Sequence, residues 1–382
     1  MRYDNLSFKF YHPSFIIHRS SFTSFSYLAI MFQKIRKWKW IISAILCFVL
    51  LNTLPSSFIE KYYANGFFLV IRNFLDNTFG KVPFPSYYIF IAFLLFIITK
   101  WFLHFFREKP QPFLQRVFKI FSFVGFLITW FFIFWGFNYG RVSLEDKLNL
   151  TIQPLTTEQL TAETEYTIEH IAQVRNSIQH DTNSIPQIVF INNIEDNSRD
   201  ALNVSLDKFG YSYSHKIRGR FVFDDMFLVF SIGGQYLPFV GEGNVDDAVY
   251  YAKKPFYLMH EMAHGNGFTE EADCNFLAYV SCVNSKNLSL EYCGELNYLS
   301  YLLPELRSRD SVAFNTIKTT LPTAIRRDLE TMKKYYEKHT FKSSFIGDAM
   351  NNIYLKIMGV QDGVKNYDKM LLLVYAWKYN KK

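Results

Sequence analysis

The stretch HEMAHGNGFTEEADCNF, residues 260–276, carries two histidines four residues apart with a glutamate directly after the first. Residues four apart lie on the same face of a helix, so His260 and His264 can present two imidazole nitrogens to one metal ion. Glu261 lies beside the first histidine, where it can reach a metal-bound water but not the metal itself. This HExxH pattern predicts a zinc site with Glu261 as the general base, as in metallopeptidases.

The residues around this motif favour a helix that ends just after the second histidine. Pro255 lies near the expected start, where a proline is tolerated because its missing N–H would have no partner there. Gly265 and Gly267 follow His264, and glycine is common just past a helix end. The next segment, EEADCNFLAYVSC, is expected to form a second helix with its acids at the N-terminal end. The chain can therefore turn back and bring an acid to the two histidines.

A catalytic zinc needs a third protein ligand and an open fourth position, and three acids follow within reach. Glu271 stands four residues before Asn275, a spacing similar to that of gluzincins, in which the glutamate binds zinc and the later residue supports a ligand histidine. Glu270 comes six residues after His264, the spacing at which metzincins place their third ligand. Asp273 has a shorter side chain and is the weakest candidate. We favour Glu271 as the ligand, with Glu270 as the second choice.

The composition indicates a membrane-embedded portion attached to a soluble one. The chain has 382 residues, of which 19% are aromatic and only 20% are charged. The formal net charge of +7 does not indicate nucleic-acid binding, because the basic residues cluster beside apolar runs and no nucleic-acid-binding motif is present. The four cysteines lack CxxC spacing, so we expect buried thiols and no cysteine zinc site.

Three apolar runs, residues 40–58, 82–99 and 120–138, are predicted to cross a membrane as helices. Lysines and arginines gather before the first run and between the second and third, whereas the loop between the first and second has fewer of them. The positive-inside bias then places the N-terminus in the cytoplasm and everything after Asn138 outside it.

The chain is accordingly divided into three parts. Residues 1–39 form an N-terminal segment, in which we interpret the residues before Met31 as an upstream extension of the reading frame. Residues 40–138 form a three-helix transmembrane region, and residues 139–382 form a soluble domain.

The soluble domain is predicted to begin with a small sheet that helices follow. Residues 156–179 show a helical period, 185–191 and 220–232 are rich in strand-forming residues, and 233–247 has the glycines and proline of a loop. Helices are then predicted at 255–265, 270–284, 291–302, 321–338, 343–357 and 362–378. The expected fold is a multi-span α-helical membrane region followed by an α+β zincin-like metallopeptidase domain of the gluzincin type.

At these motifs the sequence resembles domain of unknown function 3810, a bacterial membrane family with a zincin-like motif. The similar stretches are WGFNYGR (135–141), LPFVGEGNVDDA (237–248), HEMAHGNGF (260–268), EADCNFLAY (271–279) and YLKIMGVQDGVKNYDKMLLLV (354–374). The family has glutamate where this chain has Asp273 and alanine where it has Cys274, whereas Glu271 matches, which favours Glu271 as the ligand. The resemblance implies a bacterial inner membrane protein, but no substrate.

Other polar residues are candidates for contact with a substrate. The stretch PFVGEGNVDD precedes the motif helix, where zincins often line their cleft, and Glu242 and Asn244 are its candidate cleft residues; a plain connector is the alternative. A tyrosine could stabilise the oxyanion of the reaction. The candidates, among which the sequence does not choose, are Tyr279, Tyr298, Tyr336 and Tyr354.

We expect a membrane-anchored zinc metallopeptidase with Zn²⁺ held by His260, His264 and Glu271, Glu261 as the base and Asn275 behind a ligand histidine. Its partners would be the lipid bilayer and a peptide or protein substrate near the membrane, on the extracytoplasmic side, and not nucleic acid. The alternative is a non-catalytic membrane protein, in which a zinc is structural or the zincin scaffold binds a partner.

Overall fold

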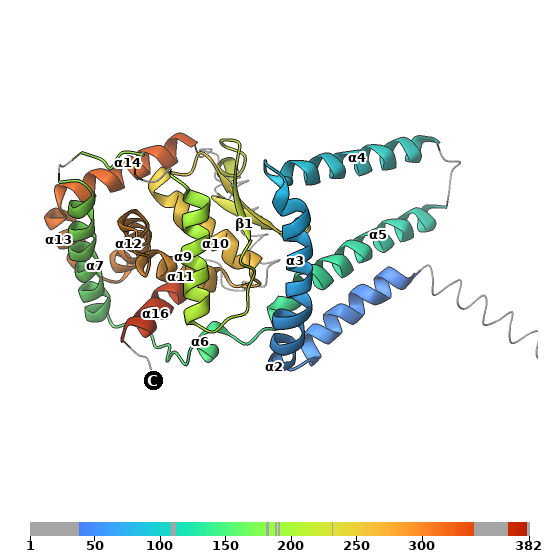
Figure 1. Ribbon diagram of the computed structural model, residues 1–382, viewed down its shortest axis with the longest axis horizontal. Helices are drawn as coiled ribbons and strands as arrows, with labels where there is room; N and C mark the ends of the chain where they lie inside the picture. Colours follow the sequence, from blue (N-terminus) through green and yellow to red (C-terminus); the bar gives the residue numbers. More distant parts are fainter. Residues whose placement is uncertain are drawn as a thin grey trace, which may run out of the picture. The chain divides into compact units, whose positions relative to one another are not determined.

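The computed structural model of the protein describes residues 38–107, 112–180, 183–187, 189, 192–230, 232–339 and 366–379. This part of the chain is mostly helical and contains one small mixed sheet (Figure 1). It divides into two compact units. One contains the described residues up to Phe48 and those from 112 to Thr129, and the other contains the remainder, including the sheet.

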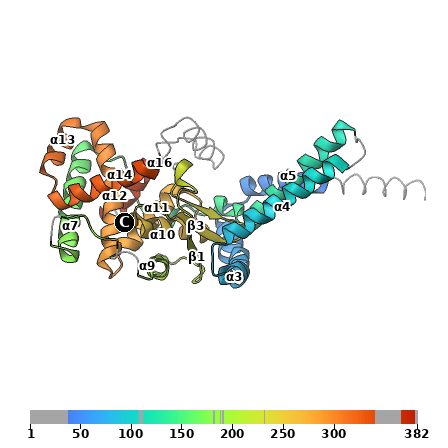
Figure 2. The same cartoon turned by 90° about the horizontal axis from the view of Figure 1, so that it is seen from above.

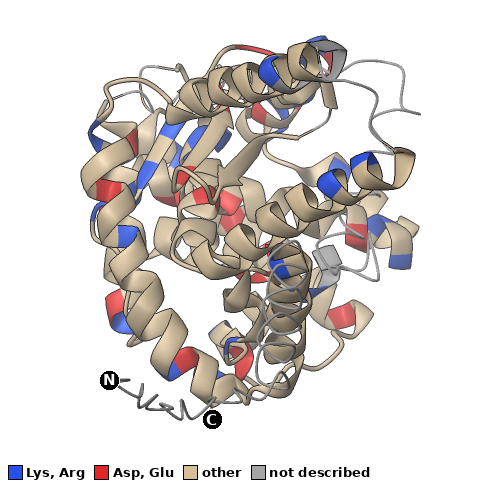
Figure 3. Cartoon of the chain, turned by 90° about the vertical axis from the view of Figure 1, so that its right-hand side faces the viewer, with Lys and Arg blue, Asp and Glu red and all other residues tan. Residues whose placement is uncertain are grey.

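Two helices, α4 (Ser86–Arg107) and α5 (Phe113–Phe134), are long and apolar enough to cross a membrane. Both are uncharged over most of their length, with basic residues toward one end (Figure 3). They match the predicted runs 82–99 and 120–138, with boundaries that differ by several residues. Helix α4 begins only after Pro85, because a proline fits the first positions of a helix better than its interior.

The first predicted span, residues 40–58, does not form one straight helix. The helix Trp38–Thr53 ends before Pro55, and the chain continues as a second helical stretch, Ser56–Lys81, bent by 109° from the first. Proline favours such a break because it has no backbone N–H for the helical hydrogen bonds. The broken pair is a third candidate crossing only if both pieces belong to one span.

The smaller unit contains a close contact between two apolar helices. Gly125 of α5 lies against the backbone of Trp40, whose carbonyl oxygen would be only 2.8 Å from a Cβ added to the glycine. The ring of Trp40 packs edge-on against Phe126, with ring centroids 4.8 Å apart. A small residue at the contact lets two apolar helices approach closely, as is common in membranes.

The predicted loop between the first and second spans is helical instead. Its elements are α2 (Ser56–Phe58), the π-helix η1 (Ile59–Phe67), α3 (Phe68–Thr78) and the 3-10 turn η2 (Phe79–Lys81). One face of this stretch is buried. The apolar members of the buried face are Ile59, Ala64, Phe68, Ile71 and Leu75. These apolar residues recur at helical spacing, and their burial against the rest of the larger unit stabilises the helix more than its sequence propensity does.

The remaining elements of the larger unit follow in chain order. They are η3 (Gly136–Gly140), α6 (Leu144–Lys147), α7 (Thr157–Ile178), α9 (Ile194–Lys208), β1 (Arg218–Val222), η4 (Leu228–Phe230), β2 (Gly234–Leu237), β3 (Glu242–Asp246), η5 (Tyr251–Lys253), α10 (Lys254–Gly265), α11 (Glu271–Val283), α12 (Leu288–Arg309), α13 (Ser311–Thr320), α14 (Thr323–His339) and α16 (Asn366–Tyr379).

The sheet has the strand order β1-β3-β2, with β1 parallel and β2 antiparallel to the central strand β3. Glu242 is the partner of Arg218 on one side and of Leu237 on the other. The segment 233–247, predicted as a loop, is therefore largely a hairpin, because its glycines and proline mark the tight connection and not the whole stretch. The strand predicted at 220–232 ends at Val222.

A strand predicted at 185–191 is wrong wherever it can be compared, since residues 185–187 and 189 are not in a strand. The β-branched composition of this segment is only a weak local preference, which tertiary packing overrides. Helix α9 was not predicted. Its sequence, IEDNSRDALNVSLDK, is mostly polar, and only a narrow stripe that includes Leu202 and Leu206 is buried.

The predicted helix 156–179 is confirmed as α7, which begins with a capping box between Thr156 and Gln159. The four predicted helices between 255 and 338 correspond to α10, α11, α12 and α14. The predicted helix 343–357 lies outside the described residues. Of the last predicted helix, the described part begins at Asn366 as α16.

The motif helices lie at the centre of the larger unit, where α10 packs against the sheet, α9 and α11 (Figures 1 and 2). Every residue of α11 from Ala272 to Cys282 is buried. A helix that is buried on all sides is held by its neighbours over its whole length, which makes it a rigid support for side chains at its N-terminal end.

Candidate metal centre

The two histidines of the motif lie on one face of α10, and Glu271 is the first residue of α11. Helix α10 begins with Pro255 in its first turn and ends at Gly265. Gly267 then adopts a φ of +87°, a left-handed conformation that side chains other than glycine rarely take. This tight turn returns the chain at once, so that Glu271 meets the preceding helix as the sequence predicted.

The three side chains converge on one point. The Nε2 atoms of His260 and His264 are 3.2 Å apart. The Glu271 carboxylate places Oε2 3.1 Å from Nε2 of His260 and Oε1 3.4 Å from Nε2 of His264. Of the described residues, these three form the one group of His, Cys, Asp and Glu side chains whose donor atoms lie together closely enough to hold a metal ion.

These separations fit a tetrahedral zinc ion. With zinc–nitrogen and zinc–oxygen distances of about 2.0–2.1 Å, tetrahedral ligands lie roughly 3.3 Å from one another. The three separations of 3.1, 3.2 and 3.4 Å scatter around that value. Two neutral imidazoles and a carboxylate also match the donor set of catalytic zinc. The Glu271 side chain remains 28% exposed, so the group is open to solvent on one side.

Each histidine is oriented through its other ring nitrogen. Nδ1 of His260 is 2.8 Å from Oδ1 of Asn275, and Nδ1 of His264 is 2.9 Å from the carbonyl oxygen of Phe268. If each Nδ1 carries the proton, as these acceptors require, both Nε2 lone pairs point toward the metal position. The thiol of Cys274 also contacts this imidazole, with Sγ 3.3 Å from Nδ1 of His264.

The charges of the three groups are coupled. Burial alone would raise the pKa of Glu271, yet the two imidazoles hold this pKa well below its usual value. Conversely, burial would lower the pKa of His264, but Cys274 and Glu271 raise it well above its usual value. The negative charge of Glu271 therefore favours a proton on His264, and a dication at the same point would take the place of that proton.

Glu261 projects from α10 toward β2. It is 4% exposed, and burial raises its pKa to about 7, with the nearby histidines opposing and Glu271 adding to this rise. No described residue donates a hydrogen bond to its Oε2. A Cβ added to Gly234 would lie 2.6 Å from Oε1 of Glu261, and one added to Gly243 would lie 2.6 Å from its Cβ. Glycines in β2 and β3 thus make room for this carboxylate beside the edge of the sheet.

The two alternative acids, Glu270 and Asp273, lie next to Lys369 and not at the histidines. Lys369 of α16 forms ion pairs with Glu270 and with Glu145, and its Nζ is 3.9 Å from Asp273. Asp273 is buried, which raises its pKa to about 7. The structure therefore brings Glu271 to the histidines and directs Glu270 and Asp273 to Lys369.

The two residues predicted to line a cleft lie in the central strand. Glu242 is 2% exposed and accepts a hydrogen bond from the backbone N–H of Ser86, at the start of α4, over 2.8 Å. Asn244 is fully buried and donates from Nδ2 to the carbonyl oxygen of Glu242. Glu261 itself lies against Gly234 of the edge strand β2 and Gly243 of β3, in a segment that was predicted as a loop.

The three candidate tyrosines that the structure describes do not gather at the histidines. Tyr279 donates to Glu295 over 3.2 Å and packs on Tyr298, with ring centroids 4.7 Å apart, and both rings are fully buried. Tyr336 is 47% exposed on α14. Tyr354 lies outside the described residues. None of the three described tyrosines is therefore placed as a contact of the metal group.

The segment after α5 reaches the site, which sequence reasoning did not predict. The indole N–H of Trp135 donates to the carbonyl oxygen of His264 over 2.8 Å, and Arg141 donates to that of Asn266 over 3.1 Å. Burial raises the pKa of Tyr139 to about 12, and the charges of His264 and Glu271 also act on it. The stretch WGFNYGR (135–141) stood out through its resemblance to a family motif. Chain spacing alone does not show that it contacts a helix more than a hundred residues later.

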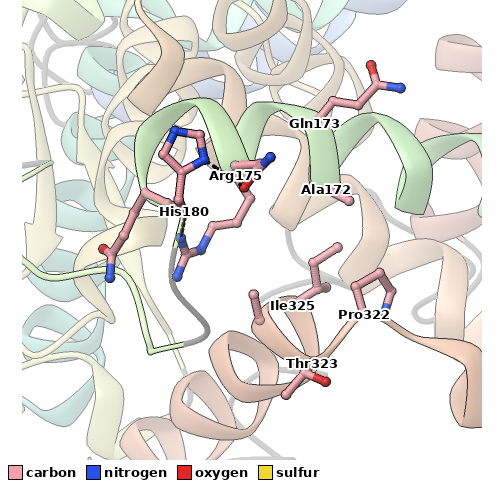
Figure 4. Close-up of a pocket in the computed structure, with 10 residues that line it drawn as sticks. Ala172, Gln173, Arg175, His180, Pro322, Thr323 and Ile325 are labelled. Atoms are coloured by element: carbon pink, nitrogen blue, oxygen red, sulfur yellow. Dashed lines mark hydrogen bonds between the residues drawn. The ribbon is translucent and has the colours of Figure 1, made fainter.

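A separate surface cavity of about 480 Å³ lies between the end of α7 and the start of α14 (Figure 4). His180 lies there beside Asn176, and Arg175 is held by Asp328, 2.9 Å away. These groups already have partners, and the cavity contains no group of side chains that could bind a metal among the described residues. We therefore place the candidate site at the motif helix.

Residues 63–375 match a family described as "Protein of unknown function (DUF3810)". No curated protein matches the chain significantly, and no solved structure does. The family match extends over both motif helices and both candidate membrane helices, α4 and α5.

Proposed function

We propose that this chain, which belongs to the DUF3810 family of unknown function, is a membrane-anchored zinc metallopeptidase. The observation that carries the proposal is the convergence of His260, His264 and Glu271 at separations of 3.1–3.4 Å, the spacing of ligands around one zinc ion. The adjacent glutamate, Glu261, supplies the base that peptide hydrolysis requires.

The residues around the site have distinct roles in this proposal. When bound, the metal supplies Lewis acidity, which polarises a carbonyl group and acidifies water. Glu261 accepts a proton from the attacking water and returns it to the nitrogen of the leaving amine, so that one water and one peptide bond give a carboxylate and an amine. Asn275 and the carbonyl of Phe268 hold the two imidazole rings in place.

A structural zinc in a non-catalytic membrane protein is the alternative. Structural zinc sites are closed by four protein ligands, whereas catalytic sites keep one position open. Three ligands converge here among the described residues, and Glu271 is partly exposed. This open arrangement favours catalysis. The burial of His264, which is 5% exposed, favours the alternative, because it restricts access to the site.

Metal analysis of two matched variants tests the ligand set. Full-length protein purified in detergent should contain about one equivalent of zinc. Glu271→Gln should lose most of this zinc, whereas Glu270→Gln, which changes the preceding carboxylate, should retain it. Less than about half an equivalent in the wild type, or equal zinc in both variants, would contradict the proposed site.

Catalysis is tested separately with Glu261→Gln, which preserves shape and removes the base. Membranes that contain the wild type should show new peptide N-termini that are missing with this variant, although both proteins hold the same amount of zinc. If the variant and the wild type give the same N-termini and the same cellular phenotype, the zinc is structural and the alternative holds.

A further inference from the structure

The helical stretch from Ser56 to Thr78 has two faces of opposite character. Its inner face is buried in the larger unit, as described above. Its outer face exposes a row of large apolar side chains. These are Phe58, Tyr62, Phe67, Val70 and Phe74, which are 45, 55, 51, 66 and 59% exposed. Such a contiguous apolar surface is unusual on a face that contacts only water.

This stretch lies between an apolar helix and a candidate membrane helix. The helix Trp38–Thr53 ends just before it, and seven residues separate Thr78 from Ser86, where α4 begins. At about 3.3 Å per extended residue, this connection holds the end of the stretch within roughly 25 Å of a membrane helix. In Figures 1 and 2, α3 runs across the direction of α4 and does not continue it.

The charges of the stretch are inconsistent with a membrane span but fit an interfacial helix. Glu60, Arg72 and Asp76 lie on the inner face and are buried in ion pairs. The exposed cation is Lys61, and asparagines 73 and 77 flank the outer row near its end. A helix with one apolar face, flanked by a lysine and amides, lies in the plane of the headgroups with that face toward the acyl chains.

We propose that Ser56–Thr78 is an interfacial helix whose outer row binds the lipid surface of the bilayer. The occupant is lipid and not a second copy of the chain, because the stretch follows the apolar helix Trp38–Thr53 and is connected to α4, which is long and apolar enough to cross a bilayer. A surface held in this position meets lipid before any protein partner.

The inner face of the same helix is bonded to the hairpin next to Glu261 and, through Arg141, to the backbone that follows α10. Arg72 donates to the hydroxyl of Tyr236 over 3.0 Å and to the carbonyl oxygen of Gly241 over 2.8 Å, in the hairpin beside Glu261. Glu60 binds Arg141 over 2.9 Å, and Arg141 in turn binds the backbone just after His264.

The candidate centre is therefore attached to a helix that faces lipid, and substrates would be membrane-proximal segments of peptides or proteins. This statement about substrates rests on the proposed function, whereas the lipid contact does not.

Lipid contact is measured with full-length protein that carries one environment-sensitive fluorophore. Val70→Cys is labelled with a maleimide dye, and Val312→Cys, a valine on α13 that is 74% exposed, is the matched control. The four native cysteines are buried, and wild type treated with the dye gives their background. Each protein is reconstituted in phosphatidylcholine vesicles with or without bromine on the acyl chains.

Brominated lipid should quench the label at position 70 by about two-fold or more and leave the label at position 312 unchanged. Phe74→Cys, one helical turn further on, should behave like Val70→Cys, which covers the case that one variant does not fold. Quenching at positions 70 and 74 by aqueous iodide in place of brominated lipid would overturn the proposal. Protection from both quenchers would indicate a protein partner and would overturn it as well. The measurement does not depend on zinc.

Discussion

The indole of Trp135 donates its N–H to the main-chain carbonyl oxygen of His264, 2.8 Å away. Trp135 directly follows the candidate span α5, and His264 is a candidate zinc ligand at the end of α10. The last turn of a helix has carbonyl groups without helical partners, and this buried one accepts both from the indole of Trp135 and from the backbone N–H of Gly267, 3.0 Å away. The residue that follows the candidate membrane helix α5 is thus bonded directly to the helix that carries the candidate metal ligands.

Trp135→Phe should loosen this attachment. The buried carbonyl of His264 would lose one of its two donors and keep the backbone N–H of Gly267. The loss of one such hydrogen bond costs about 0.5–1.5 kcal/mol and lowers the midpoint of thermal unfolding by a few degrees. Thermal unfolding of full-length protein in detergent is the measurement. Trp130→Phe, at a position that is 40% exposed in α5, is the control and should shift the midpoint less. Equal shifts in the two variants would show that the hydrogen bond to His264 does not contribute measurably to stability.

Asn275→Ala should weaken zinc binding without unfolding the protein. The Asn275 side chain is 2.8 Å from Nδ1 of His260, and removal of such a partner costs about 10- to 100-fold in metal affinity. Competition with a chromophoric chelator gives the affinity. Asn275→Asp keeps an acceptor at this place and should retain tighter binding than the alanine variant. Unchanged zinc affinity in Asn275→Ala would show that Asn275 does not support zinc binding.

Gly234→Ala should slow peptide hydrolysis on the order of 100-fold while zinc stays bound. The added methyl group would come 2.6 Å from Oε1 of Glu261 and 2.9 Å from the carbonyl oxygen of Asn244, so the carboxylate must move. Misplacement of a catalytic group by about 1 Å costs on the order of 100-fold in rate. The rate is followed on a substrate found from the cleavage products. Gly66→Ala, whose new methyl group meets its nearest neighbour at 3.7 Å, should keep the wild-type rate.

Glu242→Gln should stabilise the protein at high pH. Burial raises the pKa of Glu242 from 4.5 to about 7, so the folded state binds this proton more tightly than the unfolded state. The wild type therefore loses stability as the pH rises from about 4.5 to about 7, and the loss persists above that window. Glutamine carries no charge to bury and can still accept the bond from Ser86.

The advantage of Glu242→Gln should be absent near pH 4 and reach the order of 1–3 kcal/mol at pH 8. Chemical unfolding of the two proteins at both values measures it. Exposed Glu337→Gln serves as the control and should show no such trend. An advantage that is the same at both pH values would mean that the ionisation of Glu242 is not its cause.

A topology reporter should place the soluble domain outside the cytoplasm. The basic residues gather before the first apolar run and between α4 and α5, which the positive-inside bias assigns to the cytoplasm. Alkaline phosphatase fused after Lys382 should then be active, and a fluorescent protein that folds only in the cytoplasm should be dark at the same position. The opposite pattern would turn the candidate site toward the cytoplasm and leave its metal chemistry unchanged.

Local patterns in the sequence predicted the helices with strong periodicity and the chemistry of the motif. His260 and His264 are four residues apart on one helix, and helix geometry alone places them together. Glu271 follows a short turn that Gly267 makes possible, so its approach to the histidines is also largely a local matter. The apolar runs of α4 and α5 are long enough to be recognised by composition.

The contacts that only the tertiary structure decided join residues far apart in the chain. The hydrogen bond of Trp135 to His264 spans 129 positions and that of Ser86 to Glu242 spans 156, and no local pattern marks such pairs. The hairpin of β2 and β3 was hidden because glycines lower strand propensity, although here they admit Glu261. The helix between the first two predicted spans was not predicted because its charged residues are buried. Arg72, for example, pairs with residues from a distant part of the chain. Burial of a charged residue becomes favourable only when distant partners pair with it, and chain spacing does not record where those partners lie.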